Sequence, residues 1–199
     1  MKTSNLIKYQ SRNPAQQFLI KRQFRAIIQL LKTKKINKVA DIGCGEGFVL
    51  NQLALNHIGT EYIGLDNSRE ALKAAKKIHS NFKYMKGNIY KLPFKAGKFD
   101  LVICGEVLEH LVDPEAALRE LNRISRKYVL ISVPLEPWFQ LMNFIRGKYI
   151  YTFGNHPEHI NWWGIHSLER LVNKRLKILS HTISLPWQTV LCTVNKKGA

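Results

Sequence analysis

A glycine-rich turn is the segment of this sequence best suited to binding a ligand. Gly43, Gly45 and Gly47 occupy every second position, directly after an apolar run that contains Asp41. Glycine has no Cβ and tolerates positive φ, so such a turn lets the backbone approach a ligand to contact distance. We expect a strand before the turn and a helix over 48–55 after it. This arrangement is the nucleotide cradle of doubly wound α/β folds.

The spacing of the glycines argues against a dinucleotide. The phosphate-binding pattern G-x-G-x-x-G, read from Gly43, needs a glycine at the position that Phe48 occupies, and the third glycine is Gly47 instead. Glu46 also adds an anion where a pyrophosphate would lie. The turn therefore predicts a nucleoside ligand that carries no phosphate.

The turn resembles motif I of the class I S-adenosylmethionine (SAM) methyltransferases, in the form D-x-G-x-G-x-G. SAM has no phosphate and carries a cationic sulfonium, so an acidic rim is compatible with it. The resemblance implies that Gly43, Gly45 and Gly47 shape the cofactor pocket, that Cys44 contacts the cofactor and that Asp41 braces the loop. A tight strand-to-helix turn without a ligand is the alternative.

A second acidic position follows the next predicted strand, 61–66. Asp66 follows Gly43 by about the interval at which Rossmann-type folds place the acid that accepts two ribose hydroxyls. We expect Asn67 beside it to contact the cofactor as well. Ser68 is the predicted N-cap of the helix that follows. Farther along the chain, Asp113 is the predicted N-cap of a helix over 114–124, the fifth strand is predicted over 128–133, and another helix is predicted to begin at Ser167.

Two further strands bring polar residues to the same edge of the sheet. Asn88 and Ile89 follow the predicted strand 82–86, where the methyltransferases usually have an Asp that accepts from the adenine amino group. The resemblance implies that Asn88 and Ile89 flank the adenine, because the amide oxygen of Asn88 is still an acceptor. Glu106 follows the predicted strand 99–104, and the resemblance places it at the methionine end of SAM.

The succession of motifs over 39–133 resembles the type 11 branch of these enzymes, which includes quinone-biosynthesis and many small-molecule methyltransferases. It implies SAM as cofactor, a small-molecule acceptor and a Rossmann-like α/β fold. That fold has a mainly parallel seven-stranded sheet, helices on both faces and an antiparallel last strand. Within one domain of 199 residues we distinguish a basic helical cover (1–37), a SAM-binding core (38–133), an aromatic acceptor lid (134–163), and a closing helix with antiparallel strands (164–199).

The net charge of +17 is unevenly distributed, with ten Lys or Arg residues and no acid over 1–38. One interpretation is a lysine-rich solubilising surface. The other is attraction to a polyanion, either nucleic acid or an anionic membrane face. Within this segment we predict an amphipathic helix over 14–31, which in the resembling family lies across the SAM pocket. Tyr9 and Arg12 just before it are candidate substrate contacts, with plain surface packing as the alternative.

Three cysteines, odd in number and widely spaced, predict buried thiols in a reducing compartment and no disulfide or zinc site. No apolar run reaches the length of about 18 residues that a membrane span needs. The N-terminus also lacks the pattern of a secretory signal. We therefore expect a cytoplasmic protein without a transmembrane segment, and the sequence gives no indication of its oligomeric state.

The predicted lid holds eight aromatic side chains and leaves the carboxyl end of the fifth strand. Ligands of open α/β sheets bind at the carboxyl ends of strands, so the lid should overhang the site. Trp138, His156 and His159 are its candidate substrate contacts. A local aromatic core without substrate contact and an interfacial, lipid-facing helix over 138–145 are the alternatives.

Glu109 and His110 are the candidate catalytic residues. Methyl transfer from a sulfonium is an in-line displacement, so the enzyme mainly aligns the reactants and excludes water. A base is needed only if the acceptor must lose a proton, and His110 or Glu109 could take it. The alternative is that both residues orient SAM or cap a short helix.

A metal-dependent function and a non-enzymatic one are further alternatives. Glu106-x-x-Glu109-His110 followed by His159 matches the metal-ligand pattern of the small-RNA 3′-end 2′-O-methyltransferases. Two carboxylates and two imidazoles suit Mg²⁺ or Mn²⁺, and the basic N-terminus would hold RNA phosphates. The same turn occurs in metal-free relatives, so we predict no metal. A SAM- or RNA-binding module without turnover is the non-enzymatic alternative.

Overall fold

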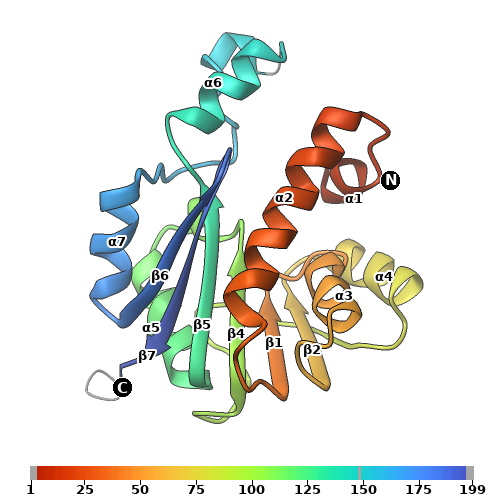
Figure 1. The fold of residues 1–199 in the computed structure, drawn as a ribbon, viewed down its shortest axis with the longest axis vertical. Coiled ribbons are helices and arrows are strands. Elements are labelled where there is room, and N and C mark those ends of the chain that lie inside the picture. Colours follow the sequence, from red (N-terminus) through yellow and green to blue (C-terminus); the bar gives the residue numbers. More distant parts are fainter. Residues whose placement is uncertain (1–3, 148, 196–199) are drawn as a thin grey trace.

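The protein is described here by a computed structural model, which places residues 4–147 and 149–195. The helices and strands alternate along most of the chain (Figure 1). In order they are α1 (Ser4–Tyr9), α2 (Pro14–Leu31), β1 (Lys38–Ile42), α3 (Phe48–Leu55), β2 (Glu61–Asp66), α4 (Arg69–Ile78), β3 (Lys83–Lys86), β4 (Phe99–Gly105), η1 (Leu108–His110), α5 (Pro114–Ile124), β5 (Ser125–Pro134), α6 (Trp138–Ile145), η2 (Ile150–Thr152), α7 (Ile165–Asn173), β6 (Leu176–Ser184) and β7 (Trp187–Val194).

The seven strands form one sheet in the order β3-β2-β1-β4-β5-β7-β6. Strand β7 runs antiparallel to both of its neighbours, whereas the pairs from β3 to β5 are parallel. The predicted mainly parallel, seven-stranded sheet with an antiparallel last strand is confirmed. Its carboxyl-terminal edge, from β1 to β5, is therefore the edge where the motif residues gather.

Strand β4 shows why the central strands have continuous apolar runs. Its side chains alternate between two cores, because successive residues of a strand point to opposite faces. Val102 and Cys104 pack into the core beneath α5 and α7, whereas Leu101 and Ile103 pack into the core beneath α2 and α3. Helices thus cover both faces, as predicted. The three cysteine thiols are free and buried, which also agrees with the prediction.

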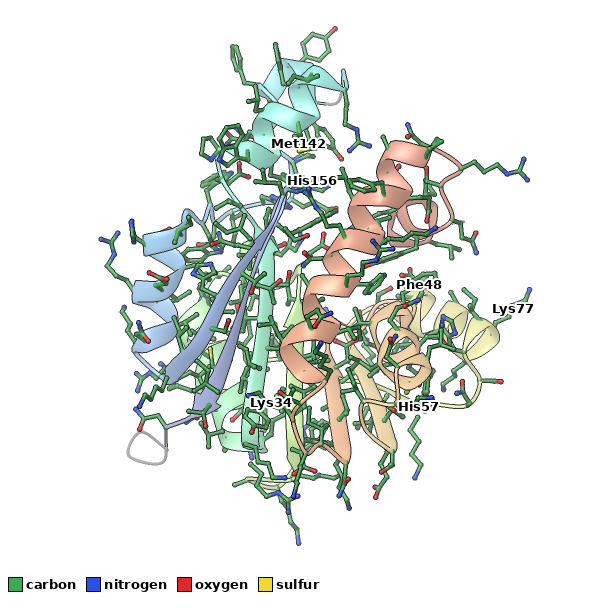
Figure 2. All side chains as sticks on the ribbon, in the orientation of Figure 1. Lys34, Phe48, His57, Lys77, Met142 and His156 are labelled. Carbon is green, nitrogen blue, oxygen red and sulfur yellow. The ribbon has the colours of Figure 1, made fainter. Side chains whose placement is uncertain are left out.

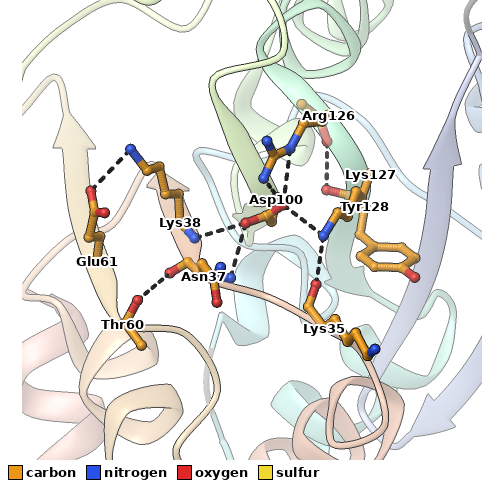
Figure 3. Close-up of polar contacts among 10 residues, drawn as sticks. Lys35, Asn37, Lys38, Thr60, Glu61, Asp100, Arg126, Lys127 and Tyr128 are labelled. Carbon is orange, nitrogen blue, oxygen red and sulfur yellow. Dashed lines mark hydrogen bonds and ion pairs between the residues drawn. The ribbon is translucent and has the colours of Figure 1, made fainter.

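A buried carboxylate ties the strands together at the end opposite the glycine turn (Figure 3). Asp100 Oδ2 accepts from the backbone N–H groups of Asn37 and Lys38 at 3.0 and 3.1 Å. Asp100 Oδ1 lies 2.5 Å from the Arg126 guanidinium and 3.0 Å from Lys127 Nζ. These partners hold the pKa of the Asp100 carboxyl below its ordinary range despite its burial. The network fixes β1, β4 and β5 in register.

Local signals set the helix starts. Ser68 Oγ accepts from the Ala71 N–H and Asp113 Oδ1 accepts from the Ala116 N–H, so both predicted N-caps are confirmed. The predicted bounds of α2, α3 and α5 agree with the structure. Helix α7 begins two residues before the predicted start at Ser167, because Gly164 takes the N-cap position.

The predicted lid leaves β5 as one excursion, which carries α6 and η2, and stands beyond the end of the sheet (Figure 1). Its two ends lie together, since the Glu136 N–H donates to the Trp163 carbonyl at 3.0 Å. The lid base is tied to η1, where the Asn161 amide donates to the Leu111 carbonyl at 2.7 Å. Within the described part of the chain, every helix is too short or too polar to span a bilayer.

Candidate active site

A cavity of about 520 Å³ opens at the carboxyl ends of the central strands. This volume lies in the range of small-molecule and cofactor sites. Figure 2 shows Met142 and His156 between α6 and the end of the sheet, where the lid forms the upper wall. The lining joins motif residues of the core to lid residues, among them Gly43, Asp66, Asn88, Glu106, Glu109, His110, Phe139, Met142, Arg146, His156 and His159.

The glycine turn has the backbone geometry that its sequence predicts. The φ angles of Gly43, Gly45 and Gly47 are 79°, 52° and 80°, which side-chain-bearing residues rarely adopt. A Cβ on Gly43 would also lie 2.3 Å from the Val107 side chain, and one on Gly47 would lie 2.3 Å from Tyr84 Oη. Backbone conformation therefore favours glycine at all three positions, and close packing adds to this at Gly43 and Gly47.

The turn contributes little of its own surface to the cavity. Gly43 lines the cavity, whereas Cys44, Gly45 and Gly47 lie outside its lining. The Gly43 N–H donates to the Leu65 carbonyl at 2.7 Å, which holds the turn against the end of β2. The turn thus shapes one wall, and the predicted contact of Cys44 with the cofactor stays a prediction.

Asp66 is fixed in place at the cavity wall. Its Oδ2 accepts from the Gly45 N–H and its Oδ1 accepts from the Ser68 N–H, each at 2.8 Å. A carboxylate oxygen has a second acceptor direction, so both oxygens can still receive a hydroxyl. Asn67 beside it also lines the cavity. This geometry suits recognition of a ribose diol.

Asp41 is buried behind the glycine turn and does not line the cavity. Burial, and then the negative charge of Asp66, raises the pKa of Asp41 to about 7. Within the described residues its Oδ2 has no hydrogen-bond partner. Its predicted role in bracing the loop stays a prediction.

Asn88 and Ile89 both line the cavity at the end of β3. The side-chain oxygen of Asn88 accepts from the Tyr90 N–H at 2.9 Å, which closes a tight turn. An amide oxygen has two lone pairs, so one acceptor direction is left for a ligand. The predicted contact with an adenine is compatible with this geometry.

Glu106 carries a cationic partner that the sequence analysis missed. Lys8 Nζ of α1 lies 2.6 and 2.7 Å from its two carboxylate oxygens, and both residues line the cavity. Glu106 itself has a φ of 56°, and its N–H donates to the Ser132 carbonyl at 2.7 Å. No local signal distinguishes Lys8 from the other basic residues of the N-terminal segment. The ion pair places α1 across the predicted methionine end of the site.

Glu109, His110 and His159 form one cluster on the cavity wall. One potential ligand atom from each lies within 4.8 Å of the others. Within the described residues neither carboxylate oxygen of Glu109 has a hydrogen-bond partner. Burial, and then Glu106, raises the pKa of Glu109 well above its ordinary value. Burial, and then the neighbouring His110 and His156, lowers the pKa of His159 to about 4, so its imidazole is neutral near pH 7.

The tautomer of His110 follows from its partner. His110 Nδ1 lies 2.9 Å from the Glu158 backbone carbonyl. A carbonyl oxygen only accepts, so Nδ1 carries the hydrogen and the neutral ring has its lone pair on Nε2. An imidazole fixed in this way can accept a proton or bind a metal ion through Nε2.

The other predicted substrate contacts divide into two groups. His156 and His159 line the cavity, and their contact with a substrate stays a prediction. Tyr9, Arg12 and Trp138 lie outside the lining, so direct contact with an acceptor in this cavity is not supported for them. Tyr9 instead stacks on Phe48, with ring centroids 4.4 Å apart.

Trp138 lies outside the lining because of its angular position on α6. Phe139, Met142 and Asn143 face the cavity, and their spacing of three and four residues marks one face of a helix. Arg146 extends the same face toward the mouth. That spacing is a sequence signal which could have identified these four lining residues.

Comparisons with known proteins agree with this geometry. A family model described as a methyltransferase domain matches residues 40–131. An uncharacterized methyltransferase of Schizosaccharomyces pombe is 36% identical over 104 residues, which cover 47% of this chain and 37% of that protein. A ubiquinone biosynthesis O-methyltransferase of Coxiella burnetii is 28% identical over 151 residues, which cover 66% of this chain and 62% of that protein. The chain thus spans less than two thirds of the length of either relative.

A solved structure with the same fold is the magnesium protoporphyrin IX methyltransferase from Synechocystis, which holds bound SAH, the demethylated product of SAM. It superposes with a TM-score of 0.67 at 16% identity and covers 92% of this chain and 88% of its own. At this identity the superposition establishes the likeness of the folds.

Proposed function

We propose that this chain, which belongs to the class I SAM-dependent methyltransferases, transfers a methyl group from SAM to a small acceptor held beneath the lid. The observation that carries the proposal is that one cavity joins Asp66 and Glu106 to Glu109, His110 and the lid. Donor and acceptor must lie in one enclosed space for an in-line transfer.

The residues present fit SAM. Asp66 offers two fixed carboxylate oxygens to the ribose, Asn88 offers an amide to the adenine, and Glu106 offers its carboxylate to the ammonium group of the methionine end. Among the described residues, the lysine and arginine side chains that line the cavity are Lys8 and Arg146, and the charge of Lys8 is neutralised by its ion pair with Glu106. When bound, SAM supplies an electrophilic methyl group and a neutral leaving group.

His110 supplies the proton acceptor in this proposal. Its Nε2 lone pair takes the proton that an acceptor hydroxyl or amine loses as the methyl group arrives. The Glu158 carbonyl holds the imidazole in the required tautomer. Phe139 and Met142 cover the cavity, and they favour the aligned, water-poor arrangement that the displacement needs.

Titration calorimetry with SAH tests the donor site. We expect wild-type protein to bind SAH and Asp66→Ala to bind it at least about 10- to 100-fold more weakly, because even one hydrogen bond to a charged acceptor contributes about 1.5–3 kcal/mol. Glu61→Gln, an exposed position at the other end of β2, is the matched control. Absence of SAH binding by the wild-type protein would overturn the proposal.

A radiolabelled methyl screen against fractionated cell extract tests turnover and identifies the acceptor. We expect His110→Ala to lower kcat by about 100-fold or more, the usual contribution of a general base, while the Kd for SAH stays unchanged. Full turnover of His110→Ala at every pH would remove the proton-acceptor role.

A second candidate function is metal-dependent 2′-O-methylation of RNA. The observation that favours it is the Glu109, His110 and His159 cluster, with two imidazoles and a buried carboxylate that has no hydrogen-bond partner among the described residues. A mixed set of nitrogen and oxygen ligands suits Mn²⁺ or Mg²⁺. Calorimetry with MnCl₂ and a turnover assay in EDTA test this function. It is supported if the wild-type protein binds Mn²⁺, Glu109→Gln does not, and EDTA abolishes turnover. Full turnover in EDTA would exclude it.

A further inference from the structure

Helix α6 carries apolar side chains on opposite faces. Phe139 and Met142 face the cavity, whereas Trp138, Leu141 and Ile145 face outward and are 49%, 46% and 72% exposed. A helix that is apolar on all sides is normally covered on all sides. The inner face has its cover, and in the described structure the outer face has none.

The exposed apolar surface continues beyond α6. Phe144 belongs to the same helix, and Tyr151 and Phe153 extend the surface over η2, where Tyr151 is fully exposed. We call this surface the lid patch; it consists of Trp138, Leu141, Phe144, Ile145, Tyr151 and Phe153. Single exposed apolar residues are ordinary, but the six of the lid patch lie within residues 138–153, and such a concentration favours an interaction site.

The surroundings of the lid patch are cationic. The sequence contains no Asp or Glu between Glu136 and Glu158, and Arg146 is exposed at the end of α6. Arg12, between α1 and α2, is exposed at the same end of the molecule (Figure 1), whereas Lys8 is paired with Glu106 and Lys34 lies at the opposite end (Figure 2). An apolar patch with a cationic rim is complementary to an anionic lipid surface.

We propose that the lid patch docks on an anionic membrane surface. The aliphatic side chains of Leu141 and Ile145 favour lipid over nucleic acid, because bases stack on aromatic rings. A second copy of the chain would bring a second charge of +17 against the first, so self-association through this patch is disfavoured. Trp138 and Tyr151 are of the residue types enriched at membrane interfaces.

Docking through the lid patch places the bilayer against the outer face of α6, one helix away from the cavity on its inner face. Met142 and Arg146 lie on the same helix as the patch and line the cavity. An acceptor of lipid character would then reach His110 from the bilayer, beneath the lid; this step rests on the proposed function. Docking itself requires no turnover and is tested separately.

Vesicle co-sedimentation of the full chain tests docking. The probes are vesicles of phosphatidylcholine alone and of phosphatidylcholine mixed with phosphatidylglycerol. We expect binding to the anionic vesicles, weaker binding to the neutral ones, and an about tenfold or larger loss of affinity for Ile145→Glu. Leu55→Glu is the matched control, since Leu55 is 65% exposed at the end of α3, away from the lid.

Ile145→Ser is the milder second variant, and SAH calorimetry on each variant verifies that the site is folded. Equal vesicle binding by wild-type protein and both Ile145 variants would overturn the proposal, and so would absence of binding to anionic vesicles. If the wild-type protein bound a single-stranded oligonucleotide or formed a dimer instead of binding vesicles, and Ile145→Glu abolished that interaction, the lid patch would be assigned to that partner and the proposal would be overturned. A failure of SAH binding would instead count against the proposed function.

Discussion

Replacing Asp41 by Asn should change how the stability of the protein depends on pH. Asp41 is buried, and its pKa rises from 3.8 to about 7 in the folded protein. One pKa unit corresponds to about 1.4 kcal/mol. Between the two pKa values the carboxyl is ionised in the unfolded chain but protonated in the folded one, so the free energy of unfolding falls by about 4 kcal/mol over this pH range. This is a large part of a typical unfolding free energy of about 5–15 kcal/mol.

The sign follows from proton binding. An acid with a raised folded pKa holds its proton more tightly in the folded state, so its contribution is present at low pH and is lost as the pH rises through its folded pKa. We expect the unfolding free energy of Asp41→Asn, relative to the wild-type protein, to rise by about 4 kcal/mol between about pH 4 and about pH 8.

Urea unfolding of both proteins at several pH values measures this difference. Comparing variant with wild-type protein removes the contributions of the other titrating groups, including Glu109, whose pKa is also raised. A pH-independent difference would refute the assignment of a protonated carboxyl to Asp41. A difference of the opposite sign would mean that a cationic or donor partner holds it ionised.

Two further predictions concern other charged groups. Asp100→Asn should lower the unfolding free energy at pH 7 by about 2–4 kcal/mol, because the amide carries no charge and its single oxygen can serve either the N–H groups at the start of β1 or Arg126, but not both. Since the pKa of Asp100 is lowered, chemical denaturation should show this loss above about pH 4 and a smaller one as the pH falls further. Lys8→Met should strengthen SAM binding about fivefold in calorimetry, because Lys8 and the cationic cofactor compete for Glu106. Weaker SAM binding by that variant would mean that Lys8 instead closes over the bound cofactor.

Local structure was predictable because its causes are local. The N-caps Ser68 and Asp113 and the prolines at the starts of α2 and α5 specify where helices begin. The glycine turn was predictable for the same reason, since positive φ restricts the residue type. The sheet topology followed from the family resemblance that the turn and Asp66 support.

The meeting of distant segments was harder to predict. Lys8 and Glu106 are separated by 98 positions, and nothing near Lys8 marks it as the partner. His159 joins Glu109 only because the lid folds back over η1. Sequence reasoning suggested this pair solely through the metal-site alternative.

Trp138 illustrates a different limit. Helix α6 is short and apolar on both sides, so hydrophobic periodicity alone does not decide which face is inward. The polar Asn143, 6% exposed, marks the inner face, because its amide donates to the Gly154 carbonyl at 3.1 Å. That bond depends on a loop eleven residues away.

The hydrogen bond between Glu136 and Trp163 has an evolutionary consequence. Because it brings the ends of the lid together, the lid leaves and rejoins the core at one place, beside the hydrogen bonds that join Glu158 and Asn161 to the η1 region. Insertions, deletions or wholesale replacement there leave the strand register and the donor half of the cavity intact. New substrate preferences can therefore arise on this scaffold by exchanging about thirty contiguous residues.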